Sequence, residues 1–218
     1  MIRYVLITAA RNESAIIETT LKSVVSQTQL PERWVIVDDG STDETPNHVG
    51  RYAAQHPWIE LIRRPQRADR SFAGKAQAVN LALERMKDIA FEVVGNLDAD
   101  VSFEPDYMAF VVEKFAGNPK LGVAGTPFTE VGGYDSTRDS FEGQNYVAGP
   151  CQLFRRTCWQ GIGGYVVWFN DPRPTQLPLK DRFSAPPGNI SAEIVTTGIS
   201  AHASGIIDLA PKIGRAHV

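Results

Sequence analysis

Apolar residues follow two different periods along residues 4–125, and the two periods alternate. Short, bounded apolar runs predict buried strands over residues 4–10, 34–37, 58–62, 91–97 and 122–125. Apolar positions spaced by three or four residues predict helices over residues 15–28, 45–56, 73–86 and 105–116. Strands that alternate with helices in this way predict an α/β fold with a central, mostly parallel sheet.

Polar and breaker residues mark the limits of these elements. We expect Asn12 or Ser14 to cap the helix after the first strand. Pro31 ends that helix, because proline disfavours helix at the residue before it. Residues 129–145 are polar and contain glycine, so we expect a mobile loop over the site there. Ordered structure is expected to resume over residues 147–156.

The pattern changes after Tyr165. Prolines crowd residues 172–187 without a sustained period, although residues 190–199 are strand-like. We therefore expect a domain over residues 1–165, incomplete at its C-terminal side, and an irregular, proline-rich tail over residues 166–218. Residues 213–218 match one reading frame of a common sequencing adapter, and we interpret them as adapter-encoded. A frame shift from about Val166 is a second hypothesis, and resequencing the source DNA tests both.

Composition and charge narrow the class of protein. With 218 residues, 43% of them hydrophobic and 22% charged, the chain has the composition of a soluble globular protein. Its formal net charge of −3 gives no overall positive electrostatic potential to attract nucleic acid, so we expect no nucleic-acid partner. Cys151 and Cys158 are interpreted as reduced thiols, and no apolar run approaches the ~20 residues that span a bilayer. We expect a cytoplasmic protein, with peripheral contact at the inner face of the membrane left open.

The strongest candidate chemistry follows the strand over residues 91–97. That strand runs into Asp98-Ala99-Asp100, and alternate residues of a strand share a face, so both carboxylates can reach one ion. Two hard oxygen donors suit Mg²⁺ or Mn²⁺. Taken alone, however, an Asp-x-Asp after a strand is more often a solvated turn.

Further polar clusters are expected where the other parallel strands end or the next helix begins: residues 8–13, residues 38–41 and Gly74-Lys75. A doubly wound sheet brings such ends together in one crevice. Each cluster also has a plain structural interpretation. Residues 38–41 are typical of a turn, Lys75 of a solvated helix start, and Glu13 of a helix N-terminal cap.

A nucleotide diphosphate would use these clusters in specific ways. Asp39 would accept hydrogen bonds from a base N–H. Asp98 would approach the ribose or a metal ion, and Asp100 the metal. Lys75 or Arg11 would neutralise phosphate oxygens. The chain lacks both the P-loop and the Gly-x-Gly-x-x-Gly pattern, which argues against a P-loop enzyme and a dinucleotide-binding dehydrogenase.

Together these motifs resemble glycosyltransferase family 2, whose members have the GT-A fold. The resemblance is carried, in order, by residues 8–13, residues 35–43, Gly74-Lys75 with Asn80, and Asp98-Ala99-Asp100, and it extends to about Tyr165. It implies that the domain over residues 1–165 is a GT-A catalytic domain. Residues 151–156, followed by Gly163-Gly164-Tyr165, resemble the acceptor-side strand of the family and the turn after it.

The resemblance also implies roles for single residues. Those matching Thr8, Glu13 and Asp39 line the nucleotide pocket, and the one matching Lys75 lies near the phosphates. The Asp-x-Asp, here Asp98 and Asp100, holds a divalent metal, Mn²⁺ or Mg²⁺.

The implied activity is the metal-dependent, inverting transfer of a sugar from a nucleotide-diphosphate sugar to an acceptor hydroxyl, on a saccharide or a lipid-linked acceptor. The catalytic base of the family would follow Gly163-Gly164. Asp171 lies in that region, but Pro172 and Pro174 flank it where a helix should start, so the catalytic base stays unassigned.

Other functions are weighed against this one. The Gln-x-x-Arg-Trp motif of the processive synthases is absent, which disfavours a polysaccharide synthase. Two alternatives stay open: a nucleotide-sugar-binding remnant without catalysis, and a nucleotidyltransferase. The second would usually carry a glycine-rich, basic loop where Arg11-Asn12-Glu13 stands.

Overall fold

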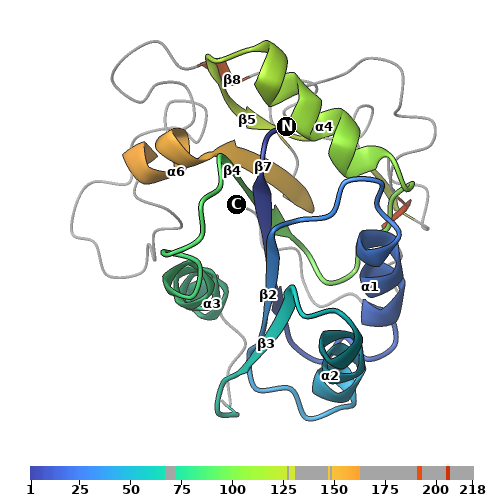
Figure 1. Cartoon of the computed structure of the whole chain (residues 1–218). Helices are drawn as coiled ribbons and strands as arrows, with labels where there is room; N and C mark the ends of the chain where they lie inside the picture. Colours follow the sequence, from blue (N-terminus) through green and yellow to red (C-terminus); the bar gives the residue numbers. More distant parts are fainter. Residues whose placement is uncertain are drawn as a thin grey trace.

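A seven-stranded sheet with strand order β3-β2-β1-β4-β7-β5-β8 runs through the centre of the molecule (Figure 1). The computed structural model describes residues 1–66, 72–126, 128–130, 147, 149–162, 191–192 and 205–206. The strands of the sheet are β1 (Tyr4–Ala10), β2 (Arg33–Asp38), β3 (Ile59–Arg63), β4 (Val93–Leu97), β5 (Leu121–Ala124), β7 (Cys151–Arg155) and β8 (Ser191–Ala192). Strands β3, β2, β1 and β4 are mutually parallel, and β7 runs antiparallel to β4 and β5. The predicted mostly parallel sheet is confirmed.

Helices cover both faces of this sheet (Figure 1). Helices α1 (Ile17–Val25), α2 (Thr45–Gln55) and α4 (Tyr107–Gly117) lie on one face, and α3 (Phe72–Glu84) and α6 (Arg156–Ile162) lie on the other. Side chains alternate along a strand, so β1 sends Tyr4 and Leu6 into one hydrophobic core and Val5 and Ile7 into the other. Burial on both faces explains why the parallel strands are continuous apolar runs in the sequence.

The turn after β1 differs from the prediction. The N-cap of α1 is Ile16 and makes no side-chain cap hydrogen bond, so the expectation that Asn12 or Ser14 caps this helix is wrong. Asn12 has a φ of 56°, a conformation that asparagine tolerates better than most residues, and its Oδ1 accepts a hydrogen bond from the Thr42 N–H at 2.8 Å. The Ser14 N–H donates to Asp43 Oδ2 at 3.0 Å. These residues therefore join the end of β1 to the loop after β2.

Helix α6 was not expected from the sequence. It comprises seven residues directly after β7 and contains Gly161, so it is too short for a helical period to stand out. Its residues Cys158 and Trp159 are buried, and the Trp159 ring packs edge-on against Phe154 with centroids 4.9 Å apart. Tertiary packing, rather than a sequence period, holds this helix against the sheet.

Other expectations fall wholly or partly outside the described residues. Residues 131–145 of the predicted loop and Asp171 are among these, while Thr129–Glu130 forms strand β6, which pairs with β9 (Gly205–Ile206). Within the strand-like residues 190–199, Ser191–Ala192 forms β8 and pairs with β5. The domain boundary at residue 165 stays a prediction. Among the described residues, no helix combines the length and the apolar character needed to cross a membrane.

Candidate functional site

The carboxyl ends of β1, β2 and β4 place the predicted site residues at one edge of the sheet. The three strands are parallel and end at Ala10, Asp38 and Leu97, so Arg11, Asp39 and Asp98 each follow directly. Backbone hydrogen bonds continue past the strand ends. The Asp39 N–H donates to the Ala10 carbonyl at 2.9 Å, and the Asp98 N–H to the Pro150 carbonyl at 2.9 Å. This is the edge at which open α/β sheets bind their ligands.

Acidic side chains and one lysine come together at this edge. Burial raises the pKa of Asp100 to about 7, the charges of Asp98 and Glu13 raise it as well, and Lys75 acts in the opposite direction. Lys75 Nζ lies 2.6 Å from Asp98 Oδ1, with both side chains about one-third exposed. Glu13, Lys75 and Asp98 therefore lie near enough to Asp100 to influence its ionisation.

This group has the right chemistry for a hard divalent cation. A cation between two carboxylates would reduce their mutual repulsion, and Mg²⁺ and Mn²⁺ prefer oxygen donors. Among the residues that the structure describes, no three His, Cys, Asp or Glu side chains form a ready metal site. Magnesium sites commonly need only one or two carboxylates, the other ligands being water and substrate phosphate. Asp98 and Asp100 therefore fit the metal implied by the resemblance.

Asp39 is part of an ion pair that the sequence analysis missed. Arg64 Nη1 donates to Asp39 Oδ1 at 2.7 Å, and the side chains are 18% and 9% exposed. Arg64 is the first residue after β3, which ends at Arg63. Applying the same strand-end rule to β3 would therefore have identified it as a candidate.

The segment at residues 38–41, which contains the predicted site residue Asp39, bends tightly as β2 ends. Asp38 Oδ1 accepts a hydrogen bond from the Ser41 N–H at 3.0 Å, three residues further along the chain. Gly40 has a φ of 77°, and a Cβ there would lie 2.7 Å from the Pro65 carbonyl oxygen and from the Gln66 Cα. Glycine is required because another backbone passes directly over the turn.

Two other polar residues on the central strands are buried. Thr8 is 1% exposed, and its Oγ1 accepts a hydrogen bond from Trp34 Nε1 at 3.0 Å. Asn96 is also 1% exposed, and within the described part of the chain its side-chain oxygen and nitrogen lack hydrogen-bond partners. Arg11, in contrast, is half-buried just past β1. The predicted contacts of Thr8, Arg11, Glu13, Asp39, Lys75 and Asp98 with a nucleotide stay predictions.

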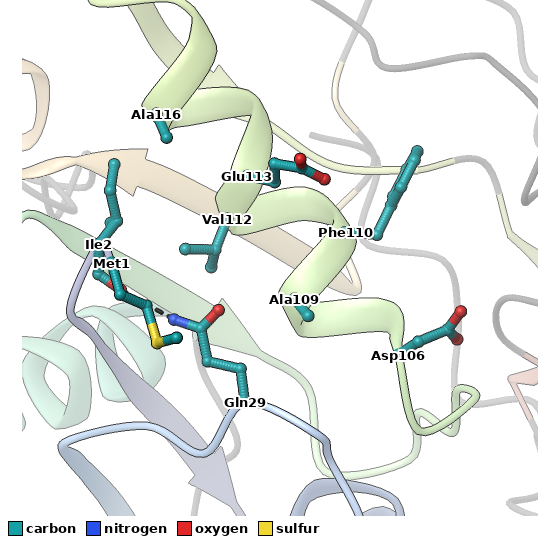
Figure 2. A pocket seen from close by; sticks show the side chains of 9 residues that line it. All are labelled: Met1, Ile2, Gln29, Asp106, Ala109, Phe110, Val112, Glu113 and Ala116. Atoms are coloured by element: carbon teal, nitrogen blue, oxygen red, sulfur yellow. Dashed lines mark hydrogen bonds between the residues drawn. The ribbon is translucent and has the colours of Figure 1, made fainter.

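A groove lies elsewhere, beside the residues that precede β1 and β2 (Figure 2). It has a volume of about 470 Å³ and is lined by Met1, Ile2, Gln29 and one side of α4. Gln29 Nε2 donates to the Ile2 carbonyl at 2.8 Å along its wall. The groove contains none of the predicted site residues.

Comparison with known proteins agrees with the fold and the motifs. The sheet and its helices have the GT-A fold of nucleotide-sugar transferases. The chain belongs to glycosyl transferase family 2, whose family model matches residues 5–163. That match includes every residue predicted for the site.

Curated relatives are bacterial enzymes named poly-beta-1,6-N-acetyl-D-glucosamine synthase. The one from Staphylococcus epidermidis is 28% identical over 173 residues, which covers 71% of this chain and 40% of the relative. The one from Staphylococcus aureus (strain COL) is 32% identical over 120 residues, which covers 55% of this chain and 27% of the relative. The chain thus spans less than half the length of these relatives.

Solved structures share the fold at lower identity. A mannosyltransferase from Pyrobaculum calidifontis in complex with GDP-Man and Mn²⁺ superposes with a TM-score of 0.66 at 23% identity, covering 98% of this chain and 58% of that one. S. aureus TarS 1-349 in complex with UDP-GlcNAc gives a TM-score of 0.66 at 17% identity, covering 96% of this chain and 59% of that one.

Proposed function

We propose that this chain is the donor-binding part of a metal-dependent, inverting glycosyltransferase that uses a nucleotide-diphosphate sugar. The observation that carries the proposal is the meeting of Glu13, Lys75, Asp98 and Asp100 at the carboxyl edge of the sheet. These residues lie inside the family match. Neighbours of the same fold that hold GDP-Man with Mn²⁺ and UDP-GlcNAc support a donor of this chemical class.

In this proposal different residues of the chain bind different parts of the donor. Asp39 accepts a hydrogen bond from the base, and Thr8 and Glu13 complete the nucleotide pocket. Asp98 and Asp100 would hold the divalent cation, which offsets the charge that develops on the leaving diphosphate. Lys75 exchanges Asp98 for a phosphate oxygen, because a diphosphate offers an ammonium group more negative charge than one carboxylate does.

Inversion requires one displacement at the anomeric carbon. A carboxylate base would take the proton from the acceptor hydroxyl while the nucleotide diphosphate leaves from the opposite face. The base is unassigned. Asp171 stays a prediction for this role and lies outside the described residues.

The sequence relatives favour a saccharide acceptor. Both are named as synthases of a polysaccharide. A growing polysaccharide is therefore the second candidate acceptor, beside a single saccharide or lipid-linked acceptor. Product length after incubation with UDP-GlcNAc and with GDP-Man would separate them.

Calorimetric titration of UDP and GDP, each with and without Mn²⁺, tests the donor site. We expect one nucleotide to bind more tightly with Mn²⁺, and Asp100→Ala to weaken that binding at least about tenfold, because it removes a metal ligand. Asp106→Ala is the matched control, since Asp106 precedes α4 and lines the separate groove. If neither nucleotide binds to the folded wild-type chain, the proposal is wrong. Equal loss in both variants would show that the effect is not specific to the site.

A further inference from the structure

Arg64 lies beside Asp39 because both residues continue neighbouring parallel strands. The Arg64 N–H donates to the Asp38 carbonyl at 2.8 Å, which extends the ladder between β3 and β2 by one residue. The Asp39 N–H extends the next ladder in the same way toward β1. The backbone thus fixes the starting points of both side chains before the ion pair forms.

The guanidinium group of Arg64 then connects this strand end to α3. Its Nη1 donates to Asp39 Oδ1 at 2.7 Å and to the Gly74 carbonyl at 3.1 Å, and its Nη2 donates to Gln77 Oε1 at 2.8 Å. The planar fork of arginine holds several acceptors in one fixed arrangement, which a lysine cannot do. Gly74 immediately precedes Lys75, whose Nζ lies 2.6 Å from Asp98 Oδ1.

Arg64 therefore joins the two ends of the predicted donor site. On one side is Asp39, expected to accept from the base, and on the other is Lys75, expected to bind the phosphates. We propose that Arg64 is a positioning residue for nucleotide recognition, which fixes the Asp39 carboxylate and sets its spacing from the start of α3. This inference rests on the proposed function. A carboxylate has about four acceptor sites, so Asp39 can hold Arg64 and still accept from a base N–H.

A purely structural role for Arg64 would be to tie α3 to the sheet, and the chain offers a matched control for that role. Arg85, just past the other end of α3, donates from its Nε to Glu60 Oε1 on β3 at 2.7 Å. This second arginine–carboxylate tie joins the same helix and the same strand region away from the predicted site. Arg85→Ala therefore reports on loosening of α3 alone.

The test is calorimetric titration of UDP and of GDP with Mn²⁺ against the wild type and the variants Arg64→Ala, Arg64→Lys, Arg85→Ala, Asp39→Ala and the Arg64→Ala/Asp39→Ala pair. We expect Arg64→Ala to weaken binding of the preferred nucleotide about tenfold or more, and to reduce the preference between the two. The nucleotide affinity of Arg64→Lys should lie between those of the wild type and Arg64→Ala, because an ammonium group cannot bridge Asp39 and α3 in the same way. Arg85→Ala should stay within about twofold of the wild type.

The double variant distinguishes positioning from an independent effect. If Arg64 acts through Asp39, its loss should weaken binding much less in the Asp39→Ala background than in the wild type. Unchanged affinity and preference in Arg64→Ala would overturn the inference while leaving the proposed function standing. An equal loss in Arg85→Ala, or full additivity with Asp39→Ala, would also overturn it.

Thermal unfolding of each variant shows whether it is folded at the titration temperature. If Arg64→Ala does not fold, the affinity and nucleotide preference of Arg64→Lys are used instead. Wild-type affinity and preference in Arg64→Lys would then overturn the inference. A folded wild-type chain that binds neither nucleotide would overturn the inference and the proposed function together.

Discussion

Asp100 combines burial with like-charged neighbours, and this makes it a pH-sensitive residue of the site. Its pKa of about 7 lies above the ordinary aspartate value of 3.8, first because of burial and then because of Asp98 and Glu13. The folded chain therefore binds this proton more tightly than the unfolded chain does. The stabilisation from the bound proton is fully present below about pH 4 and is lost as the pH rises through about 7.

We expect Asp100→Asn to gain stability relative to the wild type as the pH rises from 5 to 8 in metal-free buffer. The neutral amide cannot ionise, so it avoids the cost of a buried charge beside Asp98 and Glu13. Urea unfolding of both proteins at each pH measures the difference in free energy of unfolding. A difference that stays constant across this pH range would contradict the raised pKa. Adding Mn²⁺ to the wild type at pH 8 should restore stability that the variant does not recover.

At the scale of single residues, the sequence predicted which groups meet but not how they pair. Asp98, Asp100 and Lys75 could be placed together, because strand ends and helix starts in an α/β sheet converge. The Lys75–Asp98 and Arg64–Asp39 pairs could not be predicted, since a side-chain pairing depends on distances between elements remote in the chain. The hydrogen bond from Trp34 to Thr8 has the same origin, because the parallel register of β1 and β2 creates it.

At the scale of elements, the turn after β2 and the segment after β3 are in close backbone contact. The Arg64 N–H bonds to Asp38, and the next two residues pass over Gly40 so closely that a Cβ would lie 2.7 Å from backbone atoms. Both Asp39 and Arg64 depend on this contact for their positions. A side chain at residue 40 would therefore disturb the site as well as the fold.

Gly40→Ala should destabilise the chain by about 2 kcal/mol or more, because alanine meets both a positive φ and a backbone clash. Gly50→Ala is the matched control. Gly50 lies inside α2, and among the described residues a Cβ there would meet no heavy atom within 4 Å beyond its chain neighbours and its own helix backbone, so alanine should stabilise the chain by about 0.5–1 kcal/mol. Urea unfolding measures both changes. Opposite signs are expected, and a Gly40→Ala variant as stable as the wild type would show that the turn can move aside.

The order of the elements was predictable from their periods, and their exact limits were not. Helix α1 is shorter at both ends than the predicted 15–28. Its start is later because the residues after β1 make hydrogen bonds with the loop after β2. Helix α4 ends at Gly117, one residue after its predicted end. The Asn118 N–H donates to the Lys114 carbonyl and completes the last turn. The antiparallel direction of β7 was not predicted, because an ordered apolar run does not show which way it enters a sheet.

At the scale of the whole molecule, one hydrophobic core packs on each face of the sheet, and the polar residues of the predicted site lie at the carboxyl ends of its parallel strands. One core gathers around α1, α2 and α4 and the other around α3 and α6, so β1 and β4 are buried on both faces (Figure 1). Lys75 reaches the site from α3 on one side, and Glu13 reaches it from the turn leading to α1 on the other. Ligands that bind this edge contact elements from both layers and should therefore stabilise the whole fold.

This coupling gives a prediction that separates the proposed function from its alternatives. With Mn²⁺, the preferred nucleoside diphosphate at about 100 times its dissociation constant should raise the free energy of unfolding by roughly 2.7 kcal/mol, since it binds only the folded chain. Thermal unfolding with UDP, GDP and the corresponding triphosphates measures this, and Asp100→Ala should show little response to any of them. A glycosyltransferase donor site should respond more to the diphosphate. A larger response to the triphosphate would favour the nucleotidyltransferase. Stabilisation by UDP or GDP, without nucleotide release from UDP-GlcNAc or GDP-Man when a saccharide acceptor is present, would favour a binding remnant.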